Sequence, residues 1–169
     1  MTILETERLF LRQLTTDDAG FILELLNDSA FIQNIGDRKV RTLEEACSYI
    51  LNGPMKSYDK NGFGLYLVVL KETNESIGMC GLIRRDTLED VDIGYALLPD
   101  FWAKGYAVEA ARATKTYAKE VIGLKRIVAI VDPANAGSIR VLEKLGLQFE
   151  KMVRLSADDI ELKLFGVEL

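Results

Sequence analysis

The chain has 169 residues, of which 49% are apolar and 28% are charged, and its formal net charge is −5. This length suits one domain over residues 1–169, which can bury roughly 70% of its unfolded surface. The negative charge disfavours nucleic acid as a partner, because phosphate backbones are also negative. The same field mildly favours a cationic substrate such as an amine, although many proteins are this acidic for solubility alone.

Missing residue types exclude several kinds of chemistry. The chain has no histidine, which removes Ser-His-Asp and Cys-His catalysis and His-containing zinc sites, so we expect no metal. Cys47 and Cys80 fit neither a disulfide framework nor a metal-site spacing, and two buried thiols in a reducing compartment are expected. The N-terminal residues lack the apolar core of a signal peptide, and no apolar run reaches the length of a membrane span. We therefore expect a cytoplasmic protein without a membrane partner.

The first third of the chain predicts one strand followed by two helices. Residues 7–14 alternate in side-chain polarity, which is typical of a strand. Thr16 is a candidate N-cap for a helix with apolar residues on one side. Residues 42–45 have the capping-box pattern of a second helix, which Gly53 and Pro54 are expected to end. The polar segments that remain, and that predict connections, are residues 27–39 and 55–62.

Six further strands and two helices complete the predicted order. Three strands come in quick succession, over residues 64–70, 76–84 and 91–98. The turns between them are too short for helical crossovers, so they predict an antiparallel meander. Beyond Pro99 the expected elements are a helix over 108–121, a strand over 125–131, a helix over 135–145 that Gly146 ends, and strands over 149–155 and 160–167.

The segment Lys104-Gly105-Tyr106-Ala107 joins a predicted strand to a predicted helix. The first turn of a helix has unpaired N–H groups and a positive dipole end, and small residues allow a pyrophosphate to approach them. The segment is neither a Walker A loop nor a dinucleotide fingerprint. On local pattern alone, an ordinary loop with one glycine is the favoured interpretation.

A second polar cluster runs from Asp132 to Ser138, directly after the strand over 125–131. Asn135 and Ser138 are ordinary N-cap residues, and we expect at least one of them to cap the following helix. The alternative is that the Asn135 amide and the Ser138 hydroxyl bind a ligand. Two strand–helix units present two helix N-termini at one sheet edge, and an elongated anion can enter there if the strands splay apart.

Four segments in this order resemble the GNAT superfamily of acetyl-CoA-dependent N-acetyltransferases, and more narrowly its RimJ/RimL branch, whose named members acetylate ribosomal-protein N-termini. The segments are Thr6–Arg12 with Asp17–Ala19, Ile93–Leu97, Trp102–Ala110, and Asn135–Leu147. The resemblance implies an α+β fold: a mostly antiparallel sheet of about seven strands, with strands 4 and 5 as a splayed parallel pair and helices on both faces. It also implies acetyl-CoA as the cofactor.

The resemblance further implies roles for individual residues. It places the backbone of Leu97 and Leu98 along the pantetheine. Around the pyrophosphate it places the amides of Lys104, Gly105, Tyr106, Ala107 and Val108. It assigns Asn135 to the pantetheine or acetyl end and Ser138 to the neighbourhood of the thioester sulfur. Many members carry a tyrosine where this chain has Leu142, so Ser138 is the candidate acid for the leaving thiolate.

Acetyl transfer needs a neutral amine, so a base or a water relay must accept a proton. Asp92 is the candidate base, because it shares a strand face with the small residues Gly94 and Ala96 and burial there would raise its pKa. The alternative is a solvated strand residue, since Glu89 and Asp90 suggest a wet edge. Proximity alone can supply much of the acceleration, in which case no single base is essential.

These patterns together predict an enzyme that transfers an acetyl group to a primary amine of a protein N-terminus or a small molecule, by direct attack in a ternary complex, as a monomer or homodimer. A non-catalytic acyl-CoA-binding regulatory module is the alternative, kept open by Leu142 and the missing histidine. A nucleotide-binding domain of another fold is a third interpretation. Candidates for the acceptor site are Phe31, Ile35, Asp37, Tyr66, Arg84 and Arg154.

Overall fold

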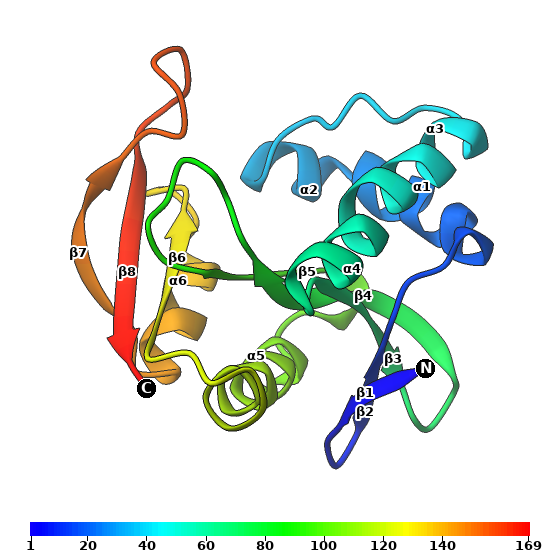
Figure 1. Cartoon of the computed structure of the whole chain (residues 1–169). Helices are drawn as coiled ribbons and strands as arrows, with labels where there is room; N and C mark the ends of the chain where they lie inside the picture. The colour runs from blue at the N-terminus through cyan, green and yellow to red at the C-terminus, as the bar shows by residue number, and fades with distance from the viewer.

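Eight strands form one mixed sheet in the computed structural model, which describes residues 1–169 (Figure 1). They are β1 (Thr2–Glu5), β2 (Leu9–Arg12), β3 (Leu65–Leu70), β4 (Glu75–Ile83), β5 (Asp92–Leu97), β6 (Arg126–Val131), β7 (Gln148–Val153) and β8 (Leu162–Glu168). Their order is β1-β2-β3-β4-β5-β6-β8-β7, and only β5 and β6 are parallel. The predicted sheet is confirmed, with one strand more than expected because β1 pairs with β2.

Helices cover both faces of this sheet, as predicted. They are α1 (Ala19–Asn27), α2 (Ser29–Asn34), α3 (Leu43–Ile50), α4 (Lys56–Asn61), α5 (Tyr106–Tyr117) and α6 (Ala136–Lys144). Figure 1 shows α1 to α4 on one side and α5 on the other. Successive side chains of β3 point to opposite faces of the sheet. Leu67 and Val69 pack with α1 and α3. Tyr66 and Val68 pack with α5 and α6.

Two helices, α2 and α4, lie where the sequence pattern predicted connections. Asp28 caps α2, because its Oδ1 accepts from the Ala30 N–H at 2.9 Å, and the helix buries Phe31. Gly53 and Pro54 do not end α3 as expected. The chain continues through a π-helical turn over Leu51–Met55 into α4, and a wider turn tolerates the missing N–H of Pro54.

Smaller details of the expectation also change. The cap before α1 is Thr15 rather than Thr16, since its hydroxyl accepts from the Asp17 N–H at 3.2 Å. Both cysteines are free, but only Cys80 is buried, and Cys47 is half-buried. No helix combines the length and the apolar character needed to cross a membrane.

Candidate functional site

The parallel pair β5 and β6 separates immediately after it forms. Its single bridge joins Asp92 to Val128, where the Val128 N–H donates to the Val91 carbonyl at 3.0 Å. Beyond this bridge β5 leads into α5 and β6 leads into α6, so both helices begin at the end where the strands diverge. The splayed parallel pair that the family resemblance implies is therefore present, and its open end is called the split below.

The edge of β5 that faces the split carries backbone groups of alternate residues. Leu98 donates to the Ile77 carbonyl at 2.9 Å, which fixes the residues of β5 that bond β4. Because antiparallel pairs alternate, Tyr95 and Leu97 turn their backbone N–H and C=O groups the other way, toward β6. The carbonyl of Leu98 also accepts from Phe101 at 3.0 Å, so both backbone groups of Leu98 already have partners. Of the two predicted pantetheine residues, Leu97 is the one whose backbone faces the split; its carbonyl accepts from the Trp102 Nε1 at 2.9 Å, so its N–H is the group left open.

The turn before α5 is exposed and has the backbone shape of an anion site. Gly105 is the N-cap of α5, in the left-handed region with φ +82°, and no side chain caps this helix. The first intrahelical bond runs from the Glu109 N–H to the Gly105 carbonyl at 3.0 Å, which leaves the preceding amides of the first turn without helical partners. The positive end of the α5 dipole lies at the same place.

Arg8, which lies between β1 and β2, holds this turn in place. Its Nε donates to Glu109 at 2.7 Å, its second guanidinium nitrogen donates to the Lys104 carbonyl at 2.9 Å, and its Cζ lies 4.4 Å from the centre of the Tyr106 ring. Desolvation opposes ionisation of Glu109, but hydrogen bonds from Thr6 and Arg8 outweigh it and hold the pKa of Glu109 below its ordinary value. Glu109 and Arg8 therefore anchor the turn.

At the start of α6, Asn135 is the capping residue and Ser138 is not. The Asn135 Oδ1 accepts from the Ser138 N–H at 3.2 Å. The Ser138 hydroxyl instead lies 2.8 Å from the phenol oxygen of Tyr95 on β5. Tyr95 thus reaches from one arm of the split to the other. No pattern marked it in advance, although it lies in the segment Ile93–Leu97 that carries the family resemblance.

Asp92 lies at the base of the split and is almost completely buried, with 2% of its surface exposed. The Arg85 Nε donates to its Oδ2 at 2.6 Å. Burial raises the pKa of Asp92 to about 6, against the opposing charge and hydrogen bond of Arg85. A solvated strand residue is therefore the wrong interpretation of Asp92, and a buried carboxyl with a raised pKa is what the structure contains.

We expect Asp92→Asn to change how stability depends on pH. The native pKa lies above the ordinary value of 3.8, so folding favours the protonated form of Asp92. Its contribution to stability is present below about pH 4 and is lost as the pH rises through about 6. Relative to the wild type, the variant should gain on the order of 2 kcal/mol in free energy of unfolding between pH 4 and pH 7, measured by urea denaturation. A difference that stays constant over this range would contradict the raised pKa.

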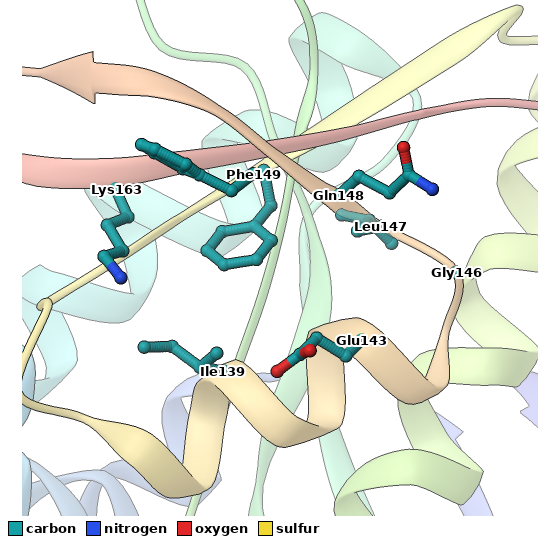
Figure 2. A pocket seen from close by; sticks show the side chains of 8 residues that line it. Ile139, Glu143, Gly146, Leu147, Gln148, Phe149 and Lys163 are labelled. Atoms are coloured by element: carbon teal, nitrogen blue, oxygen red, sulfur yellow. The ribbon is translucent and has the colours of Figure 1, made fainter.

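Other predicted residues lie outside the split or in the core. Leu142 is 1% exposed and packs inside the core. Tyr66 and Phe31 are buried as well, so they do not line an acceptor site. A cavity of about 510 Å³ lies between α6 and the β7–β8 pair, where Ile139 and Glu143 face Phe149 and Lys163 (Figure 2). None of the predicted cofactor residues lines it.

An outward-facing strand edge between two helix N-termini is an arrangement that suits an elongated anionic ligand. Residues 8–148 match the model of the acetyltransferase (GNAT) domain. The uncharacterized N-acetyltransferase YoaA of Bacillus subtilis is 32% identical over 90% of this chain and 86% of its own length. The chain belongs to the GNAT acetyltransferase family.

Solved structures agree with this assignment. The GNAT-family acetyltransferase from Bacillus anthracis is 27% identical, with a TM-score of 0.79 over 99% of this chain and 98% of that one. RimL, the ribosomal L7/L12 alpha-N-protein acetyltransferase in complex with coenzyme A, shares the fold with a TM-score of 0.85 at 18% identity, over 100% of this chain and 98% of that one. The predicted family, reaction class and acetyl-CoA cofactor are confirmed at the level of the family: the chain is an acetyl-CoA-dependent N-acetyltransferase.

Proposed function

We propose that the split between β5 and β6 holds acetyl-CoA and that the acetyl group passes directly to a primary amine in a ternary complex. The observation that carries this proposal is the outward-facing backbone edge of β5 between the two helix starts at Gly105 and Asn135. These groups fit the cofactor chemically. Pantetheine amides need strand-like backbone partners, and a pyrophosphate needs N–H donors at a helix start.

Each predicted cofactor residue takes a definite part in this arrangement. Leu97 offers its backbone N–H to the pantetheine, because its carbonyl already accepts from the Trp102 indole. Leu98 adds apolar contact, because both of its backbone groups are engaged. The amides that receive the pyrophosphate are those of Lys104, Gly105, Tyr106, Ala107 and Val108. The Asn135 Oδ1 already accepts the capping hydrogen bond, so the NH₂ group of Asn135 is the part available for the pantetheine or acetyl end.

Two residues carry the proposed proton chemistry. Ser138 donates a hydrogen bond to the sulfur that leaves, at a helix N-terminus that favours negative charge. Asp92 accepts the amine proton through water, since only its Oδ2 is engaged by Arg85 and a carboxylate with a pKa of about 6 is ionised at neutral pH. Arg85 keeps Asp92 oriented in this role.

The acceptor amine is a peptide N-terminus or a small molecule. The peptide alternative is supported by the fold shared with RimL, whose name describes an α-N-protein acetyltransferase. An acidic chain with a net charge of −5 favours an amine over nucleic acid as the partner. The two free cysteines suit a reducing compartment, and we place the protein in the cytoplasm as a monomer or homodimer without a membrane partner.

A turnover screen tests the function. The wild-type protein is incubated with acetyl-CoA and a panel of amines, including peptides with varied N-termini, and release of free CoA thiol is followed. We expect amine-dependent release for at least one class of acceptor. CoA binding without release across a broad panel would favour the regulatory module instead.

Ser138→Ala separates catalysis from capping at the start of α6. We expect kcat to fall roughly 10- to 100-fold while the KM for acetyl-CoA changes less, because the lost hydroxyl acts on the leaving group. Asn135 already supplies the cap, so the melting temperature should change little. Asn135→Ala is the matched variant and should lower thermal stability by removing that cap. Unchanged turnover in Ser138→Ala would show that its hydroxyl does not act on the leaving sulfur.

A further inference from the structure

Tyr95 makes the side-chain link across the split between β5 and α6. Its phenol oxygen lies 2.8 Å from the Ser138 hydroxyl and 3.0 Å from the Ser138 backbone carbonyl. The ring packs against the apolar cluster beneath α5 and α6, so its position is fixed by the core rather than by solvent. The link lies three residues beyond Asp92, where the last bridge between β5 and β6 ends.

The two distances allow two hydrogen-bond arrangements with the same heavy-atom positions. In the first, the phenol donates to the Ser138 carbonyl and the Ser138 hydroxyl donates to the phenol oxygen. In the second, the phenol proton turns to the Ser138 Oγ, and the serine proton is free to point elsewhere. The two arrangements differ only in the rotation of the Tyr95 and Ser138 hydroxyl groups. In the second arrangement, the serine proton has an acceptor only if an anion lies near Ser138.

We propose that Tyr95 is a positioning residue for acetyl transfer: its phenol holds the Ser138 hydroxyl at the start of α6 and releases the serine proton toward the departing sulfur. This inference rests on the proposed binding of acetyl-CoA in the split. It identifies a second hydroxyl beside Ser138 at the start of α6, a helix in which Leu142 is buried and can donate no proton.

The bonds and protons of the transfer balance around this pair. The amine nitrogen forms the new C–N bond with the acetyl carbon, the C–S bond breaks, and its electron pair leaves on the sulfur. The Ser138 hydroxyl donates a hydrogen bond to that thiolate, while Tyr95 donates to the serine oxygen. The amine loses one proton to its base, and the thiolate takes up one proton from solvent, so the products are an amide and a free thiol.

Tyr95 supports this role without giving up its own proton. Burial raises the pKa of Tyr95 well above the ordinary range of a phenol, against the hydrogen bond with Ser138. The phenol therefore stays protonated through the working pH range and acts as a donor that rotates.

A double-mutant cycle tests the proposal. Steady-state rates and melting temperatures are measured for the wild type, Tyr95→Phe, Ser138→Ala and the double variant, with an amine that the wild type acetylates. We expect Tyr95→Phe to lower kcat roughly 10-fold with the KM for acetyl-CoA within about twofold. In the Ser138→Ala background the same change should have no further effect on kcat, because Tyr95 acts through Ser138.

Tyr58→Phe is the matched control for loss of a buried phenol hydroxyl. The Tyr58 hydroxyl accepts from the Leu14 N–H at 3.0 Å and donates to the Leu65 carbonyl, far along the chain from Ser138. Its loss should lower the melting temperature and leave kcat unchanged. A folded Tyr95→Phe variant with full kcat would overturn the positioning role of Tyr95, and so would losses in kcat that add in the double variant. Either result would leave the proposed function standing. Absence of turnover in the wild type would overturn the proposed function together with the positioning role.

Discussion

Gly105→Asp is expected to abolish measurable coenzyme A binding while the protein stays folded. Gly105 is exposed at the N-cap of α5, and its backbone has φ +82°. A Cβ at this position would lie 3.2 Å from a guanidinium nitrogen of Arg8, which is the end of a flexible side chain. The left-handed backbone costs a residue with a Cβ roughly 1–2 kcal/mol, which a domain can tolerate.

The effect on binding comes from charge. A carboxylate among the first-turn amides would occupy the donors that receive the pyrophosphate and repel its negative oxygens. Two like charges 4 Å apart near a protein surface repel by about 4 kcal/mol, which corresponds to a loss of roughly 1000-fold in affinity. Calorimetric titration with CoA measures the loss, and the melting temperature reports the fold.

Gly105→Asn provides the matched control for this variant. Asparagine has nearly the same shape as aspartate and tolerates the left-handed region, but it carries no charge. We expect its CoA affinity to fall much less than that of Gly105→Asp. Equal CoA affinity in Gly105→Asp and the wild type would remove the turn from the proposed cofactor site.

The parts of the fold that could be predicted depend on short-range rules. The turns around Asn74 and residues 86–90 are too short for a helical crossover, so the antiparallel meander could be predicted from the length of these connections alone. The helix after Gly105 and the cap before α6 followed from residues that act within one turn. The helices α2 and α4 did not, because α2 depends on the burial of Phe31 and α4 on hydrogen bonds of Tyr58 with Leu14 and with Leu65 of β3.

The candidate site divides in the same way. Gly105 and Asn135 were recognisable because a helix start has a local pattern. Asn135 and Ser138 are both good caps, however, and only the distances show that Asn135 caps while Ser138 faces Tyr95. Arg8 contacts a turn about a hundred residues away in sequence, so no pattern near either segment predicts their pairing.

Gly81→Ala should destabilise the protein strongly, because β4 has no room for a methyl group at this position. The added Cβ would lie well inside contact distance of the Gly64 carbonyl oxygen and 2.8 Å from the Leu65 Cα, so β3 would have to move. Both neighbours are backbone atoms that belong to the central strands. We expect the free energy of unfolding to fall by at least about 3 kcal/mol, measured by urea denaturation, or the variant to be insoluble.

Gly94→Ala is the natural control, since Gly94 lies directly opposite Gly81 in the β4–β5 ladder. There the new Cβ would meet only the end of the Ile83 side chain at 3.1 Å and Leu65 Cδ2 at 3.8 Å. Its effect on stability should lie within about 1 kcal/mol. The contrast separates a clash with the backbone at the start of β3 from a contact with flexible side chains. Equal destabilisation by the two variants would contradict this asymmetry.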